Sequence, residues 1–228
     1  MDTFNISRNA RTEVRPFQLE GLRLIRAASN VEIEQAATFR RDVFLERRHV
    51  AFEECLEARR DRDPKSHVFL VLDGSSPVAT ARVQPYPSEL SPVLRLSQGL
   101  GNLGADSEVG RIATVQSPLT ARYSLIVLTL GAIWLLRNNS LQRYIAYCHP
   151  KLVDLYRLVG AEDAGQECIV PGRTDPHRII SGSYKDAAHL GVRLLGVTEA
   201  QVCEAIRFDV PASTLGNGGC DIQAERSA

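Results

Sequence analysis

The most informative stretch of this sequence is DSEVGRIATVQSPLTARYSLIVLTLGAIWLL, residues 106–136, where a short strand pattern runs into a long apolar helix pattern. The strand carries an acid, Glu108, and a base, Arg111, which are costly to bury unless they face each other or a ligand. Strand residues three apart point to opposite faces unless an extra residue is inserted. Gly110 makes such a bulge easy, and a bulge would turn both charges to one side, as happens beside active sites. The alternative is a mutual salt bridge at a sheet edge.

Strand and helix patterns alternate on both sides of this stretch. Upstream, the sequence predicts a strand at 22–29, a helix at 31–47 capped by Asn30, and a hairpin at 67–86 with a slightly long turn at DGSSP. Downstream, it predicts a strand at 142–149, a helix at 150–160, strands near 166–170 and 178–184, and a last helix at 198–208. This order indicates the α/β class with a mixed sheet. The segment 86–106 is a long loop, and its leucines either line the site or pin the loop to the core.

Length and composition indicate one domain. The chain has 228 residues, 44% of them hydrophobic, so we expect one folded domain at 17–210 between flexible ends at 1–16 and 211–228. Lys+Arg and Asp+Glu total 27 each, which gives no general attraction to nucleic acid or to a membrane. The start lacks the apolar core of a secretory signal, and the run 125–136 is too short to span a bilayer. Because the five cysteines are scattered and form no CxxC, we expect a cytoplasmic protein without a metal.

Three segments in order, FRRDVFLERR (39–48), VFLVLDGSSPVATARVQPYP (68–87) and SEVGRIATV (107–115), resemble the acyl-homoserine-lactone synthases and the related long-chain N-acyl amino acid synthases. An R-x-x-x-F helix, a hairpin strand with an arginine and an E-[LV]-[SG]-R strand recur in that group. They correspond here to Arg40 and Phe44, to Arg82, and to Glu108 and Arg111. The resemblance implies the fold of the GCN5-related N-acetyltransferases (GNAT), a mixed twisted sheet flanked by helices.

The resemblance also implies an activity, the transfer of an acyl group from a carrier thioester to the amine of a small molecule. Glu108 is the expected general base, acting directly or through water, and Arg111, Arg82 and Arg40 would orient it or hold a substrate carboxylate. Backbone N–H groups of the following residues would face the thioester carbonyl: Ile112, Ala113, Thr114 and Val115. No cofactor is bound permanently, because the acyl thioester is a co-substrate.

The sequence departs from the related families in three places. GNAT enzymes cradle the coenzyme A pyrophosphate with a glycine-rich loop before the helix, whereas VQSPLTARYS has no glycine and contains Pro118. This favours an acyl carrier protein as donor, with Arg122 and Arg143 as candidate contacts. The only tryptophan is Trp134, on the later helix, and the expected acidic pair is matched only by Asp61 and Asp63. A different amine acceptor from S-adenosylmethionine is therefore favoured.

Three alternatives stay open at this point. An aminoacyl-tRNA would supply an activated acyl group to the same fold, with binding that falls steeply with salt. Cys148 beside His149 raises a cysteine-dependent transferase, although strand neighbours point to opposite faces. A non-catalytic ligand sensor would be stabilised by its ligand without turnover.

Overall fold

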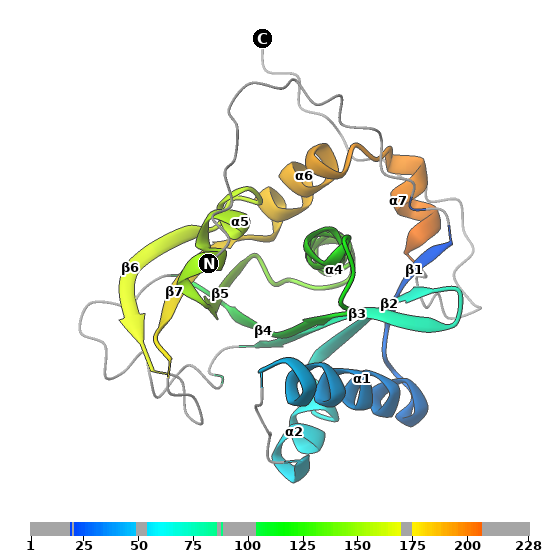
Figure 1. The fold of residues 1–228 in the computed structure, drawn as a ribbon. Helices are drawn as coiled ribbons and strands as arrows, with labels where there is room; N and C mark the ends of the chain where they lie inside the picture. The colour runs from blue at the N-terminus through cyan, green and yellow to red at the C-terminus, as the bar shows by residue number, and fades with distance from the viewer. Residues whose placement is uncertain are drawn as a thin grey trace.

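The structure is a computed structural model that describes residues 19, 21–48, 54–85, 88, 104–169 and 175–206. Within these residues, seven strands form one mixed sheet in the order β1-β2-β3-β4-β5-β7-β6 (Figure 1). The strands are β1 Leu22–Arg26, β2 His67–Asp73, β3 Ser76–Pro85, β4 Ser107–Thr114, β5 Arg143–Cys148, β6 Glu162–Cys168 and β7 His177–Ser183. Only β4 and β5 pair in parallel; every other pairing is antiparallel. The predicted mixed sheet flanked by helices is confirmed.

Helices cover the sheet on two sides (Figure 1). Helices α1, Asn30–Arg48, and α2, Glu54–Asp61, lie on one side. The other side carries α4, Thr120–Asn138, α5, Val153–Arg157, preceded by the 3-10 turn Pro150–Leu152, α6, Tyr184–Leu195, and α7, Glu199–Ala205. An opening in the sheet would therefore be bounded by α1 and α2 on one side and by α4 to α7 on the other.

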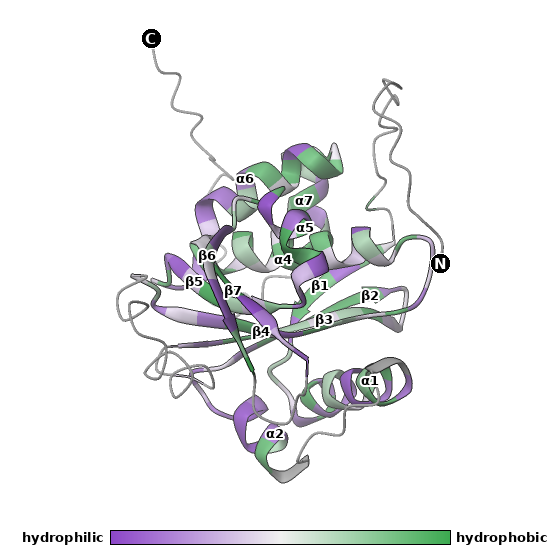
Figure 2. Cartoon of the chain, turned by 60° about the vertical axis from the view of Figure 1, so that its left-hand side comes forward, coloured by the Kyte–Doolittle hydropathy of each residue, from purple (hydrophilic) through white to green (hydrophobic). Residues whose placement is uncertain are grey.

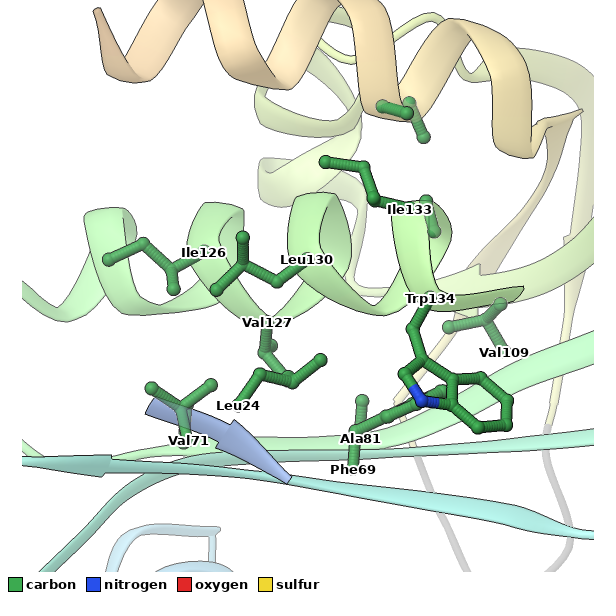
Figure 3. Close-up of a cluster of buried hydrophobic side chains, with 14 of the residues drawn as sticks. Leu24, Phe69, Val71, Ala81, Val109, Ile126, Val127, Leu130, Ile133 and Trp134 are labelled. Atoms are coloured by element: carbon green, nitrogen blue, oxygen red, sulfur yellow. The ribbon is translucent and has the colours of Figure 1, made fainter. Parts of the chain in front are cut away.

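Helix α4 lies between the sheet and α6 and supplies most of the main core (Figures 1 and 3). Its Ile126, Leu130 and Leu135 are fully buried, and Trp134 packs edge-on against Phe69 of β2. Within the described residues, α4 is the one helix whose length and apolar composition would also suit a membrane span. Since it packs on the sheet and on α6, burial in the core accounts for that composition, and Figure 2 shows it as a largely hydrophobic helix inside the fold.

Several sequence predictions need correction at their boundaries. The N-cap of α1 is Ser29, not Asn30, because the Ser29 hydroxyl accepts from the Glu32 N–H while the Glu32 carboxylate accepts from the Ser29 N–H. The hairpin turn is also tighter than expected, since Asp73 already pairs with Ser76 and Gly74 adopts a left-handed conformation.

Among the described residues, the sequence analysis missed two helices, α2 and α6. Helix α6 carries clear signals, an N-cap at Ser183 and a left-handed C-cap at Gly196, but its start directly follows the last residue of β7. The expected flexible ends at 1–16 and 211–228, and most of the loop 86–106, lie outside the described residues.

The sheet opens between β4 and β5. These strands pair only through Ser107 with Tyr144 and Glu108 with Ile145, so their remaining residues diverge. Helix α4 follows the far end of β4, which puts its N-terminus at the open end of the gap. Backbone groups of two central strands therefore face this gap without forming a ladder between the strands.

Gly191 of α6 permits the close approach of α4, and we predict that Gly191→Ala destabilises the protein. A Cβ at this position would lie 2.0 Å from Thr129 Oγ1, so the helices would have to separate. Helix propensity alone would make the same change stabilising by about 1 kcal/mol. We expect instead a loss of about 2 kcal/mol or more in the free energy of unfolding, measured by urea denaturation.

The double variant Gly191→Ala with Thr129→Ala is the control for this clash. Thr129 Oγ1 is buried and has no hydrogen-bond partner among the described residues, so Thr129→Ala alone should cost little. The double variant should recover at least about 1 kcal/mol. A stabilising Gly191→Ala would contradict the packing argument.

Candidate active site

The bulge predicted in β4 is present, and it is centred on Arg111 instead of Gly110. Arg82 pairs with Gly110 and Thr80 with Ala113, so Arg111 and Ile112 together oppose the single residue between them on β3. Arg111 is the one non-glycine residue with positive φ, 56°, in the described part of the chain. A left-handed arginine costs about 1 kcal/mol or more, so its surroundings must hold it there.

Arg111 is held by a carboxylate of α2. Its Nε and Nη2 donate to the two oxygens of Glu57 at 3.1 and 2.9 Å, and its Nη1 donates to the Tyr147 hydroxyl at 2.7 Å. Two parallel hydrogen bonds from one guanidinium fix both direction and distance. The bulge therefore turns Arg111 toward the α1 and α2 side of the sheet, the side that Arg82 and Glu108 also face.

The same carboxylate joins a buried network of alternating charges. Arg82 Nη1 donates to Glu57 at 3.0 Å and to Asp61 at 3.1 Å, and Arg40 Nη2 donates to Asp61 at 2.5 Å. Arg40, Arg82 and Asp61 are each at most 3% exposed. Glu57 and Asp61 lie four residues apart on α2, so both face the sheet.

Burial and the arginines act oppositely on the ionisation of these groups. Burial alone would raise the pKa of Glu57, but the hydrogen bond from Arg111 and the charges of Arg111, Arg82 and Arg40 lower it to about 2. Burial also lowers the pKa of Arg40, against the opposing effect of Asp61. One of its donors, Nη1, is buried and has no hydrogen-bond partner among the described residues.

Glu108 lies beside this network, directly before the strands part. Its side chain is buried, and one carboxylate oxygen accepts a short hydrogen bond from the Ser88 hydroxyl. A Cβ on Gly110 would lie 3.6 Å from Glu108 Oε1, so the absence of a side chain at 110 leaves space beside the carboxylate. Gly110 lines the opening between β4 and β5, and Glu108 lies behind it, two residues earlier on the strand.

The opening between β4 and β5 forms a cleft with two unlike sides. Tyr144, Ala146 and Cys148 of β5 pack with Val109 in the main core on the α4 side. Arg111, Tyr147 and His177 give the opposite side its polar groups, and Phe44 of α1 also lines it. A ligand in the cleft would thus contact apolar groups toward α4 and charged groups toward α2.

A second pocket continues from the cleft to the N-terminus of α4. It shares Ile112, Leu152 and Tyr156 with the cleft, and Ala113, Thr114 and Thr120 also line it. The predicted backbone donors differ in direction. The Val115 N–H donates to Val78 of β3 at 2.9 Å, and because antiparallel bonds alternate, the Thr114 N–H points away from β3, on the side of β4 that faces the gap.

The loop before α4 uses its own N–H groups. The Ser117 N–H donates to the Thr120 hydroxyl at 2.9 Å, the Leu119 N–H to the Ser117 hydroxyl at 3.0 Å, and the Thr120 N–H to the Ser117 carbonyl at 3.1 Å. Pro118 has no N–H to offer. A pyrophosphate would find these donors already engaged.

The two arginines predicted to meet a carrier lie far apart. Arg122 is in the first turn of α4, at the open end of the cleft, whereas Arg143 precedes Tyr144 at the closed end. Both are exposed, but the structure does not bring them together. Lys151 lies in the 3-10 turn Pro150–Leu152, just beyond the open end of β5, and is also exposed.

Comparison with solved structures identifies the fold. FeeM, an N-acyl amino acid synthase from uncultured soil microbes, matches with a TM-score of 0.62 and 14% identity over 73% of this chain and 92% of its own. BjaI, a CoA-dependent acyl-homoserine lactone synthase, matches with a TM-score of 0.62 and 17% identity over 83% and 93%. An acyl-CoA N-acyltransferase from Pseudomonas aeruginosa gives 0.51 and 12% over 71% and 98%. This chain has the GNAT fold. No family model matches the sequence, and no curated protein matches it.

Within this GNAT fold, the structure brings several of the predicted residues into one charged network, together with a central residue that was not predicted. Asp61 belongs to the charged network, but its expected companion Asp63 is exposed and accepts from the Lys65 N–H instead. The second acid is Glu57, one helical turn before Asp61, in a helix that the sequence analysis did not predict. Tyr147 was also missed. Among the described residues, no group of His, Cys, Asp and Glu could hold a metal ion.

We predict that Glu57→Gln removes a pH-dependent part of the stability. The folded pKa of Glu57, about 2, lies below its ordinary value of 4.5, so the unfolded chain binds the proton more tightly. The stabilisation is complete above pH 4.5 and is lost as the pH falls from 4.5 to 2. It corresponds to about 3 kcal/mol at neutral pH, which urea denaturation of Glu57→Gln at pH 7 should show as lost.

Glu34→Gln is the matched control, because the Glu34 side chain is 65% exposed and its ion pair with Arg62 is long, 3.6 Å between Oε2 and Nη2. It should change the stability by less than about 0.5 kcal/mol. If Glu57→Gln and wild type lost the same stability between pH 4.5 and 2, Glu57 would not be the anchor of the network.

Proposed function

We propose that the protein is an N-acyltransferase that moves an acyl group from a carrier thioester to the amine of a small molecule by direct attack. One observation carries the proposal: the buried Glu108 carboxylate lies beside a bulged strand at the point where β4 leaves β5. That point has a proton acceptor, a cleft for two substrates and backbone donors, the three requirements of amide formation from a thioester.

The two sides of the cleft suit the two substrates. The amine approaches from the polar α2 side, where Glu108 accepts its proton as nitrogen attacks the carbonyl carbon. The thioester enters from the α4 side, and the C–S bond breaks as the tetrahedral intermediate collapses to the amide and a thiolate. The thiolate takes the proton from Glu108 and leaves as the thiol, which restores the base. The Thr114 N–H, directed away from β3, is the proposed donor to the oxyanion.

The network behind the site has a positioning role in this proposal. Hydrogen bonds to Glu57 and Tyr147 hold the Arg111 guanidinium in place. Its positive charge therefore stays at the polar side of the cleft. Arg40 and Arg82 are anchored by Asp61. The three arginines are thus held on the side of the sheet that Glu108 faces, by the carboxylates of Glu57 and Asp61.

The proposed donor is an acyl group on a protein carrier, held through the pantetheine arm. The engaged N–H groups of Ser117, Leu119 and Thr120 favour a donor whose affinity does not depend on a pyrophosphate. Arg122 and Lys151 at the open end are the proposed contacts with an acidic carrier. Arg143 lies at the closed end and is not retained for this role.

We predict that Glu108→Gln lowers turnover at least about 100-fold, because removal of a general base costs 10²–10⁴ in rate. The amide keeps an acceptor for the Ser88 hydroxyl and the volume of the side chain, so the melting temperature should change by only a few degrees. The measurement is the rate of amide formation across pH 6–9 with a donor and amine found by mass-spectrometric screening.

Glu162→Gln, on the exposed edge strand β6, is the control and should react as fast as wild type. Equal rates of Glu108→Gln and wild type across the pH range would remove Glu108 from its role. Amide formation would then need another base.

The donor itself gives a separate prediction. If the pyrophosphate is not bound, an acyl-coenzyme A should react with a kcat/KM within about threefold of that of the same acyl-pantetheine, and the acyl carrier protein thioester should exceed both. BjaI shares the fold and is CoA-dependent, so coenzyme A thioesters belong in the comparison. A preference for coenzyme A over pantetheine of more than about tenfold would contradict the proposal, since it would require nucleotide binding.

A cysteine-dependent mechanism receives no support from the site. Cys148 lines the cleft, but burial raises the pKa of its thiol to about 11, so the nucleophilic thiolate is scarce at neutral pH. The neighbouring His149 accepts from the Lys151 N–H through Nδ1.

Aminoacyl-tRNA is the remaining donor class. Including it in the donor screen, at low and high salt, tests that class.

A further inference from the structure

The inner end of the cleft is closed by one aromatic side chain. β4 and β5 are still paired at Ser107 with Tyr144, and they separate after Glu108 with Ile145. Tyr144 is therefore the first side chain on the α4 side where the strands part, and it lines the cleft together with Val109, Ala146, Leu128 and Ile180. A chain that enters from the open end must stop at its ring.

The Tyr144 ring is fixed from behind. Its hydroxyl lies against the backbone of Gly182 on β7, where an added Cβ would come within 2.6 Å of that oxygen. The ring also packs 5.4 Å from the ring of Tyr184, whose hydroxyl is hydrogen-bonded to Ser107 Oγ at 2.7 Å. The tyrosine is 5% exposed, so no solvent-filled space is available for it to retreat into.

The free volume of the whole cleft, its polar and apolar sides together, is small. The cleft encloses about 60 Å³. An apolar cavity of about 150 Å³ holds benzene, with six carbon atoms. In proportion, the cleft takes roughly two or three carbon atoms beyond a carbonyl carbon placed at the bulge.

We propose that the protein transfers a short acyl group, of about four carbons or fewer, and that Tyr144 sets this limit. The inference rests on the proposed function, because it assigns the apolar side of the cleft to the acyl chain. It also separates this chain from a synthase of long-chain N-acyl products, even though the fold is the same.

Binding of acyl-pantetheines tests the limit without knowledge of the amine. Isothermal titration of acetyl-, butyryl- and octanoyl-pantetheine to the wild-type protein should give an affinity for butyryl at least tenfold above that for octanoyl. Tyr144→Ala should bring octanoyl to within threefold of butyryl or above it. Ala146→Leu, which fills the cleft from β5, should abolish the binding of butyryl while acetyl still binds.

Tyr123→Ala is the matched control, since Tyr123 of α4 is also a buried tyrosine of the main core but does not line the cleft. Its chain-length preference should equal that of wild type. If Tyr144→Ala does not fold, Tyr144→Leu removes the ring with less loss of volume and should shift the preference in the same direction.

The outcomes separate the two proposals. If no acyl-pantetheine binds the wild type, the thioester function fails, and the acyl limit fails with it. If octanoyl binds the wild type as well as butyryl, or if Tyr144→Ala and Tyr144→Leu keep the wild-type preference, the donor class stands but Tyr144 does not set the limit.

Discussion

The hydrogen-bonded pair between Glu57 and Arg111 is the interaction on which the rest of the site depends. An arginine with φ of 56° is a strained residue in a central strand, and the bidentate contact to α2 compensates for that strain. The bulge in turn directs Arg111 to the same side as Glu108 and interrupts the ladder of β4. Without the bulge, the regular alternation of the strand would put Arg111 into the apolar core under α4, where no carboxylate is available among the described residues.

The network is also a compromise between stability and preorganisation. Buried ion pairs contribute little net stability, because the desolvation of each charge offsets the attraction. Their value here is geometric. Glu57 contacts Arg60, Arg82 and Arg111, and Asp61 contacts Arg40 and Arg82. Arg82 and Arg111 are therefore each held by two partners. A site held in this way needs little reorganisation when charge develops in the transition state.

The sequence predicted the fold far better than it predicted the site. The strand and helix patterns carry their own periodicity, so β2, β3, β4 and α4 could be placed within a few residues. The bulge could be anticipated because Glu108 and Arg111 have the wrong spacing for one face of a regular strand. The position of the bulge's left-handed residue could not be anticipated. A glycine adopts positive φ more easily than an arginine, and only the tertiary contact with Glu57 selects Arg111 over Gly110. Glu57 itself was missed because α2 is short and highly charged, without an apolar stripe to mark it. Its partners are 25 and 54 residues away, on strands whose register no local pattern specifies.

The unlike sides of the cleft explain why direct transfer is favoured over a covalent intermediate. On the polar side, charges are abundant and fixed, and the proposed reaction brings the amine there, next to the proposed acceptor for its proton. On the apolar side, Cys148 shares the space with Tyr144 and Ala146, and the same burial that suits an acyl chain keeps its thiol protonated. A covalent acyl-cysteine would require a charged nucleophile on the side of the cleft that excludes charge. The proposed direct attack requires no charged nucleophile on the apolar side, because the amine is itself the nucleophile and comes from the polar side to the thioester carbonyl at the bulge.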